Sequence, residues 1–451
     1  SLNSINKIIK EIDKIALQKE FVFINAMYNE TIIDNNKINL SILFDETEKL
    51  YVERINIFGN FITEEKVIRN SFIVDEGDPF NELLFEKSIS NIKSKNIFSS
   101  VKKEILNSKK NPNSKIINIT VEEKPTGEIF AGLGAGTSGT SITAGIKENN
   151  YMGKGIKLNT NLSLSDSKVK GLFQVTNPNF RNSDRSLSTT LESSASDFMS
   201  ISGYKTSRTG FSLGTSYEQY DDLFLSPSIS TYYEKIDTSS KASASKQKQE
   251  GDYFETLFTY GLTVNKLNQN FQPSDGYKTS FRQTLPFYSS DDVTIEHYLD
   301  ASKYFTYAND LVFSVQFYAE AVNAIEKDVR ISKRVFIPSK KLRGFTPGKI
   351  GPQDAGEYIG GNYGSALNLT SDLPIFNEYQ NVDFNIFLDA ANLWGVDYSK
   401  LLDDSKLRSS TGLGVDWFTP IGPLTFSLAI PLIKEHTDET ETLRFNIGTS
   451  F

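Results

Sequence analysis

One stretch of the chain, Lys341-Leu342-Arg343-Gly344-Phe345, raises a chemical question because it places an arginine between two runs of alternating, membrane-type strand sequence. An arginine that faced lipid there would cost at least ~2.5 kcal/mol, even on the most lenient insertion scales. Arg343 therefore lies either in water, as an ordinary basic loop tip, or in a polar lumen with an acidic partner. The second interpretation requires the segment to fold back into a barrel.

The glycine-rich run Gly132-Leu133-Gly134-Ala135-Gly136 has the appearance of a nucleotide-binding loop. No helix pattern follows it and no Lys-Ser/Thr pair completes it, so a phosphate-binding role is excluded. Glycines within a strand weaken it and let another backbone approach closely. The run is then either a routine barrel kink or, together with Ile129, a first strand that must pair with the last strand to close a ring.

No set of residues in the sequence predicts catalysis or metal binding. The two histidines, His297 and His436, stand apart without metal-ligand spacing, and the chain has no cysteine. No Ser-His-Asp set, paired acidic motif or Walker sequence is visible. We therefore expect a protein that is not an enzyme, with no metal and no cofactor.

The composition favours a β protein of unusual hydropathy. Phe and Tyr are plentiful, at 32 and 20 residues, and the mean hydropathy of −0.34 is that of a water-soluble protein. Strands of a transmembrane β-barrel also average out as mildly polar, because lipid-facing and lumen-facing residues alternate. No window of eighteen apolar residues predicts a transmembrane helix. The net charge of −8, without a long basic run, argues against nucleic acid as a partner.

The first 124 residues alternate helical and strand patterns, which predicts α+β modules. A helical stripe covers residues 1–20, and Thr63 is expected to cap a helix that runs to about residue 71. A further helix is expected over 79–97. The strands of this region are predicted at 21–28, 37–44, 51–58, 100–106 and 115–122.

A repeat is hidden in this region. An ungapped shift by 77 residues superimposes the apolar positions of a helix and two strands, for example Ile12 on Ile89. We therefore interpret 1–48 as the C-terminal part of a β-α-α-β-β module that is complete at 49–124. A chance alignment of two helix-strand-strand units is the alternative. Such a module leaves a strand edge free, which can accept an extended peptide.

From residue 125 to 451 helical periodicity gives way to alternating runs of about ten residues, the length of a strand that spans a bilayer. The even number of runs, about sixteen, predicts an antiparallel transmembrane β-barrel. The chain begins at Ser1 without an apolar signal segment, so we expect a trimmed or mature form of an exported protein. The strands are predicted near 128–136, 140–149, 155–165, 168–177, 186–196, 207–219, 223–236, 252–267, 276–288, 292–307, 310–323, 362–374, 382–393, 410–418, 423–433 and 442–451.

The final run, from Leu443 to an aromatic residue, reads as the closing strand of the barrel. A strand in lipid is tolerable only if it is paired. A bend at Gly448 would shorten that pairing, although a closing strand with no special property is the alternative. The residues that we place on this side of the seam are Phe445, Ile447, Gly448 and Phe451.

Four motifs occur in the order in which one family of transporters carries them: Asn265-Lys266-Leu267-Asn268, Leu342-Arg343-Gly344-Phe345, Asp389 and the 417–424 segment. Together they closely resemble the BamA family of outer-membrane β-barrel insertases, within the wider family of POTRA-plus-barrel transporters. The resemblance covers nearly the whole chain. It implies that the modules are POTRA modules, that 342–345 form the signature of the sixth extracellular loop, and that Arg343 contacts Asp389 on the barrel wall.

The sequence departs from the family pattern at two places. Asn368 lies where a second acidic partner of the loop arginine is expected, so Arg343 would rely on Asp389 alone. The segment Arg69-Asn70-Ser71-Phe72 lacks the acidic residue associated with contact to an accessory lipoprotein. The second departure puts the chemistry of that contact in doubt.

The resemblance implies insertion of client outer-membrane proteins, without nucleotide, at a lateral gate between the first and last barrel strands. The implied partners are nascent outer-membrane proteins, accessory lipoproteins, periplasmic chaperones and the lipid bilayer. The implied location is the outer membrane of a Gram-negative bacterium, with the modules in the periplasm. A TamA-like or two-partner-secretion translocator of the same family is the nearest alternative, and a passive porin is a further one.

Overall fold

The computed structural model describes residues 24–34, 37–46, 50–137, 139–199, 203–220, 222–270, 272–288, 290–291, 293–307, 311–373, 375, 381–403, 405–419 and 422–447. The chain divides into two compact units. The first comprises Ser1–Gly127 with Glu148–Lys157, and the second comprises Glu128–Lys147 with Leu158–Phe451. The helix predicted over 1–20 lies outside the described residues.

The first unit contains two separate sheets. Strands β1 (Ile24–Asp34) and β2 (Lys37–Glu46) pair as an antiparallel hairpin. The second sheet has the strand order β3-β5-β4, in which β5 runs parallel to β3 and antiparallel to β4. The elements that follow the hairpin are β3 (Tyr51–Phe58), α2 (Glu65–Arg69), α3 (Glu82–Ser94), β4 (Phe98–Asn107) and β5 (Ser114–Glu123).

The core of this module lies between α3 and the sheet. Phe85, Ile89 and Ile92 recur at helical spacing along α3 and are buried against Ile117 and Ile119 of the central strand. Burying each such side chain contributes about 1.5–3 kcal/mol relative to exposure. The apolar residues at helical spacing in α3 and the buried residues of β5 therefore form one apolar layer.

The prediction that Thr63 caps the first helix of the module is wrong. The cap position of α2 is Glu64, whose side chain makes no capping hydrogen bond. The backbone N–H of Thr63 instead donates to Glu123 Oε1 at 2.6 Å, and the N–H of Ile62 donates to Glu123 Oε2 at 2.9 Å. A carboxylate at the end of β5 thus holds the backbone that leads into the helix, which begins one residue later than a Thr63 cap would place it.

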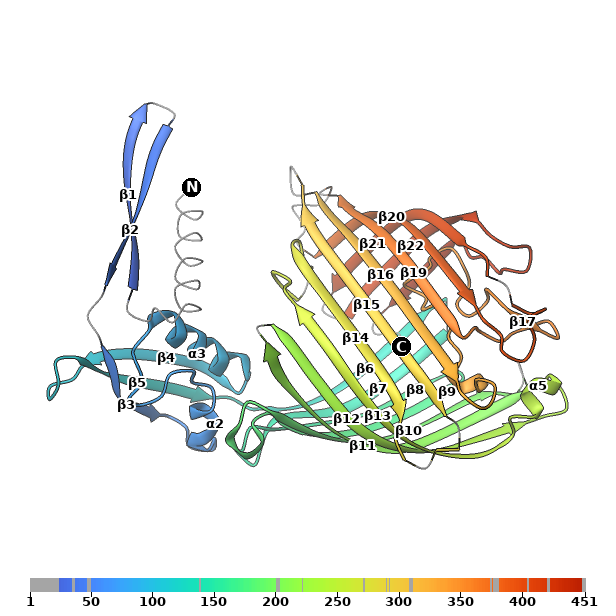
Figure 1. Cartoon of the computed structure of the whole chain (residues 1–451), viewed down its shortest axis with the longest axis horizontal. Helices are drawn as coiled ribbons and strands as arrows, with labels where there is room; N and C mark the ends of the chain where they lie inside the picture. The colour runs from blue at the N-terminus through green and yellow to red at the C-terminus, as the bar shows by residue number, and fades with distance from the viewer. Residues whose placement is uncertain are drawn as a thin grey trace. The chain divides into compact units, whose positions relative to one another are not determined.

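The second unit is a closed barrel of sixteen strands in which each neighbouring pair with a described register is antiparallel (Figure 1). This confirms the predicted fold class. The strands are β6 (Gly127–Gly136), β7 (Gly139–Tyr151), β8 (Ile156–Ser165), β9 (Lys168–Asn177), β10 (Ser186–Phe198), β11 (Tyr204–Tyr220), β12 (Leu223–Thr238), β13 (Gly251–Asn265), β14 (Gly276–Pro286), β15 (Thr294–Thr306), β16 (Val312–Ala324), β19 (Tyr363–Leu373), β20 (Val382–Trp394), β21 (Arg408–Thr419), β22 (Gly422–Ile433) and β23 (Leu443–Ile447).

Strand β20 shows why these residues form a barrel wall. Ile386 and Leu388 are more than two-fifths exposed, whereas Asn385, Phe387 and Asp389 between them are buried. Alternate residues of a strand point to opposite faces, so the apolar set faces outward and the mixed set faces the interior. An apolar outer face with a polar interior is the pattern of a barrel in lipid.

The connections contain short elements that the strand pattern did not predict. A one-turn helix, α5 (Ala244–Gln247), lies between β12 and β13. The long β16–β19 connection carries a 3-10 turn, η3 (Ile331–Lys333), and a small hairpin of β17 (Gln353–Asp354) and β18 (Glu357–Tyr358). Within the described part of the chain, no helix has the length and apolar character needed to cross a membrane.

Candidate functional site

The loop between β16 and β19 is folded back against the inner face of the barrel. Leu342 and Phe345 are 3% and 2% exposed, and they pack with Tyr318 of β16, Ala366 of β19 and Leu393 of β20. These strand residues belong to three neighbouring strands. The two apolar residues of the signature therefore hold the loop to the wall by ordinary core packing.

Arg343 forms a two-pronged ion pair with Asp389 of β20. Its Nε lies 2.8 Å from Asp389 Oδ2 and its Nη2 lies 2.7 Å from Oδ1. The backbone N–H of Arg343 donates to the same Oδ2 at 3.0 Å, and the guanidinium lies 3.4 Å from the centre of the Phe387 ring. Asp389 is fully buried. Because a bidentate pair fixes both distance and plane, it determines the position of the loop.

Asn368 of β19 completes this arrangement. Its Nδ2 donates to Asp389 Oδ1 at 2.8 Å and to the carbonyl oxygen of Lys341 at 2.9 Å. The position where the family resemblance implied a second acid thus carries an amide that binds the single acid and the loop at once. Among the described residues, Asp389 is the carboxylate paired with Arg343.

Gly344 lets the loop lie close to the next two strands. Its φ is +85°, and a Cβ built on it would lie 3.1 Å from Ala429 Cβ and 3.3 Å from Ser410 Cβ. The hydroxyl of Ser410, on β21, donates to the carbonyl oxygen of Arg343. A side chain here would be strained by the positive φ and would also crowd Ala429 and Ser410, so glycine is favoured at this position.

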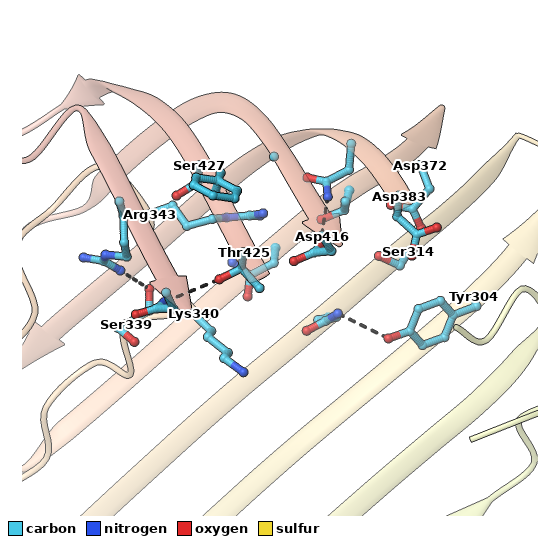
Figure 2. A pocket seen from close by; sticks show the side chains of 18 residues that line it. Tyr304, Ser314, Ser339, Lys340, Arg343, Asp372, Asp383, Asp416, Thr425 and Ser427 are labelled. Carbon is cyan, nitrogen blue, oxygen red and sulfur yellow. Dashed lines mark hydrogen bonds between the residues drawn. The ribbon is translucent and has the colours of Figure 1, made fainter. Parts of the chain in front are cut away.

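A polar cavity of about 360 Å³ adjoins the ion pair on the inside of the barrel. Figure 2 shows Asp372, Asp383 and Asp416 grouped on one side of this cavity and Arg343 on the other. The cavity thus has carboxylate groups on one side and a guanidinium group on the other. Within the residues that the structure describes, no cluster of histidine or acidic side chains has the arrangement of a metal site.

A second ion network, which was not predicted from the sequence, holds the beginning of the same loop. Arg330, 2% exposed, donates from Nη1 to Glu234 of β12 at 2.8 Å and from Nη2 to Glu255 of β13. Lys333 pairs with Glu255 at 2.6 Å. Buried glutamates at inward positions of neighbouring strands were the signal in the sequence that a basic loop residue would find partners there.

The outer part of the loop is tied to its neighbours by polar contacts. Ser245 of α5 and Tyr398 both donate to Asp354 of β17, and Lys246 pairs with Glu357 of β18. Burial alone would raise the pKa of Asp354, but these hydroxyl groups and the nearby lysine together lower it. The β17–β18 hairpin is thereby fastened to the β12–β13 connection.

The barrel closes between β23 and β6, and the structure describes part of this seam. All five residues of β23 pair with β22, whereas two pair with β6, Asn446 with Gly136 and Ile447 with Ala135. One further backbone hydrogen bond, from Thr137 N–H to the Phe445 carbonyl, measures 3.2 Å. The described part of β23 is therefore paired along its whole length on one side and along part of it on the other.

The remaining seam residues fall into two groups. Ile129 of β6 is 84% exposed, and Gly132 and Gly134 lie on the same strand. Gly136 is the glycine at the point of contact, where a Cβ would come within 2.6 Å of the Phe445 carbonyl oxygen. Gly448 and Phe451, predicted for the seam, lie outside the described residues.

A closed antiparallel barrel with an apolar outer face, a polar interior and a loop pinned inside it defines an outer-membrane-type β-barrel protein. Comparison with known families agrees with this class. The Omp85 superfamily domain matches residues 150–451, and the POTRA family, described as a surface antigen variable number repeat, matches residues 50–124. The chain belongs to the Omp85 superfamily.

Two curated relatives are named outer membrane protein assembly factor BamA. The protein of Neorickettsia risticii is 26% identical over 96% of this chain and 60% of its own length. The protein of Neisseria meningitidis is 23% identical over 89% of this chain and 57% of its own length. The chain thus spans somewhat over half the length of these relatives. Both names describe an assembly factor, and neither describes an enzyme.

The fold recurs in solved structures. BamA from Haemophilus ducreyi lacking POTRA domains 1-3 superimposes with a TM-score of 0.76 at 22% identity, over 100% of this chain and 94% of that one. CdiB from Acinetobacter baumannii superimposes with a TM-score of 0.61 at 14% identity, over 98% of this chain and 81% of that one. At these identities the likeness is one of fold.

Proposed function

We propose that this chain inserts client outer-membrane β-barrel proteins into the bilayer by templating them at the seam between β6 and β23. An unpaired backbone group in hydrocarbon costs several kcal/mol, so a nascent barrel cannot enter lipid with free strand edges. A host strand that is only partly engaged can lend its edge to an incoming strand. No nucleotide is needed, because each new backbone pairing replaces an earlier one.

The single observation that supports this proposal most is the asymmetry of β23. It is paired through all five described residues with β22 and through two with β6. Within the described residues, separating β23 from β6 breaks fewer backbone pairings than separating it from β22, and each backbone hydrogen bond is worth about 0.5–1.5 kcal/mol net. We therefore place the opening of the barrel at this seam.

The pinned loop has a positioning role in this proposal. Arg343 and Asp389 fix the signature against the wall next to the closing strands, through contacts of 2.7–2.8 Å. A buried ion pair of this kind contributes little net stability, because desolvation offsets the attraction. We assign it to holding the wall in shape while the seam opens.

The proposed setting follows from the relatives named as outer-membrane protein assembly factors. The partners would be nascent outer-membrane proteins, accessory lipoproteins, periplasmic chaperones and the bilayer itself. The domain division would be a partial POTRA module at 1–48, a complete one at 49–124 and the barrel from 125. The location would be a Gram-negative outer membrane with the POTRA modules in the periplasm.

A disulfide lock across the seam tests the proposal. The chain has no cysteine, so Ala135→Cys with Ile447→Cys, a pair of register partners, introduces the only thiols. The reconstituted, oxidised protein should stop inserting a model outer-membrane barrel into proteoliposomes and should recover on reduction. The matched control is Leu413→Cys with Leu428→Cys, register partners on β21 and β22 that face outward.

The two double variants should therefore differ only in their effect on insertion. In the control, the disulfide joins β21 and β22, which stay paired while the seam opens, so insertion should be unchanged. Full insertion activity of the locked seam would contradict the proposal. Channel conductance with no insertion by the unmodified protein would favour a passive porin.

A further inference from the structure

We infer that Arg444 is a positioning residue that couples the loop signature to the closing strand, an assignment that rests on the proposed function. Arg444 belongs to β23 and is 6% exposed. Its Nη1 donates to the Ser339 carbonyl oxygen at 2.7 Å, its Nη2 donates to the Phe345 carbonyl oxygen at 2.5 Å, and its Nε pairs with Glu441. The guanidinium of Arg444 therefore binds two backbone carbonyl groups of the loop.

The two carbonyl groups that Arg444 binds lie on either side of the signature. Ser339 precedes it and Phe345 ends it, so a single planar group holds both ends of the turn that carries Arg343. Ser339 and Arg343 lie on the same side of the cavity in Figure 2. A guanidinium has five N–H donors in a fixed fork, whereas a lysine ammonium is a point charge on a flexible stem.

Backbone contacts extend this junction along the chain before β23. Phe345 and Thr440 form an isolated antiparallel bridge. Thr346 N–H donates to the Glu439 carbonyl oxygen at 2.9 Å, and Glu441 N–H donates to the Gly344 carbonyl oxygen at 3.2 Å. The loop thus acts as an additional short strand against the segment that leads into β23.

These contacts connect the loop to three strands of the barrel. Asp389 of β20 binds Arg343, Ser410 of β21 binds the Arg343 carbonyl, and Arg444 of β23 binds the Phe345 carbonyl. The residues directly after Arg444 form the seam, because the Phe445 carbonyl accepts from Thr137 N–H and Asn446 and Ile447 pair with β6. A displacement of the loop is thereby passed to the seam.

The consequence is that the Arg343 anchor acts on the seam through Arg444. When Arg444 is present, loss of Arg343 should disturb the position of β23 opposite β6. When Arg444 is absent, the loop and β23 are already uncoupled, and loss of Arg343 should have little further effect at the seam. Two residues that share one network give non-additive effects, whereas independent residues give additive ones.

A mutant cycle read at the seam tests this inference without any client protein. The reporter is the rate at which Ala135→Cys and Ile447→Cys form a disulfide in detergent-solubilised, folded protein. Arg343→Ala should slow this rate roughly tenfold, the effect of losing charge-assisted hydrogen bonds. In the Arg444→Ala background the same change should slow it by less than about twofold. Arg444→Lys should behave like Arg444→Ala, because lysine lacks the fork.

The matched control is Arg282→Ala, which removes an arginine of β14 that stacks on Tyr298 at 4.8 Å. Its effect on the rate should be small and should add to that of Arg343→Ala. Additive effects of Arg343→Ala and Arg444→Ala, or full coupling in Arg444→Lys, would overturn the inference. Absence of insertion by the wild-type protein would overturn the proposed function and would leave this reporter result intact, so the two failures are distinguishable.

Discussion

Asn368 and Asp389 lie directly opposite each other in the β19–β20 register, and the amide of Asn368 donates to the carboxylate of Asp389 at 2.8 Å. The same amide nitrogen lies 2.9 Å from the Lys341 carbonyl oxygen. The neutral amide of Asn368 therefore orients the Asp389 carboxylate that binds Arg343, and it also holds the loop through the Lys341 carbonyl. A second acid at this position would have repelled Asp389 in a buried site.

Replacing this amide by an apolar group should loosen the loop. Asn368→Leu leaves the Lys341 carbonyl without its donor and removes one hydrogen bond from Asp389, which should weaken the loop attachment by about 1–3 kcal/mol. Faster hydrogen exchange at the Arg343 amide, which donates to Asp389 at 3.0 Å, measures this effect. Asn323→Leu on β16, whose amide oxygen accepts from Tyr363, is the control without a loop contact. Equal exchange rates in both variants would contradict this role of Asn368.

The ion pair of Arg343 and Asp389 should matter more for position than for stability. Arg343→Ala leaves Asp389 buried and unpaired, which should destabilise the barrel by about 3–5 kcal/mol yet leave it foldable. The double variant Arg343→Met with Asp389→Leu should recover most of that stability, because no charge stays buried. Denaturant unfolding of both variants gives the two free energies.

Client insertion separates the two roles of the same pair. The single and the double variant should both insert a model barrel poorly, because neither holds the loop in place. Wild-type insertion by the double variant would mean that the pair serves stability alone. Wild-type insertion by Arg343→Ala would remove the role that we assign to the loop.

Gly344 offers a test of close packing in the signature. Gly344 and Gly356 have nearly the same φ, +85° and +81°, but a Cβ at Gly344 would contact Ala429 and Ser410, whereas nothing lies within 4 Å at Gly356. Each glycine-to-alanine change should cost about 1 kcal/mol for the backbone conformation alone. Gly344→Ala should cost an additional ~1–3 kcal/mol for overpacking. Thermal unfolding of the two variants compares them directly, and equal shifts would exclude tight packing at the signature.

The strands of the barrel were predictable because their signal is local. Alternation along each run and turn residues between runs predicted sixteen strands, and β9 begins and ends where the sequence placed it, at 168 and 177. The elements that were missed, such as α5 and the β17–β18 hairpin, are too short for any period to emerge. Their formation depends on contacts with other loops.

The site was predictable only in part, for a different physical reason. Arg343 stands out because an arginine in a membrane barrel needs a partner. The roles of Asn368, Ser410 and Arg444 depend on which strand residues face the loop, and that depends on register. A shift of one residue would turn each of these side chains to the other face, so the sequence alone does not determine their contacts.

Glu123 should make the loop before α2 sensitive to acid. Its carboxylate accepts the backbone N–H groups of Phe61, Ile62 and Thr63 at 3.1, 2.9 and 2.6 Å. Burial raises the pKa of Glu123, but the hydrogen bonds from Thr63, Ile62 and Phe61 outweigh this and lower it below its ordinary value. A carboxyl group with a lowered pKa stabilises the folded state above its ordinary pKa, and this contribution is lost as the pH falls through the lowered value. Hydrogen exchange at the three amides, corrected for the intrinsic rate, should therefore accelerate below about pH 4.

Glu123→Gln removes the titrating charge and one of the two acceptor oxygens. The remaining amide oxygen still accepts, but the NH2 group cannot, so protection of the three amides at neutral pH should fall by about 1–3 kcal/mol and should no longer change with acid. Glu122→Gln, the preceding residue on the opposite face of β5, is the matched control and should keep the acid response. An acid response that survives in Glu123→Gln would assign the titration to another group.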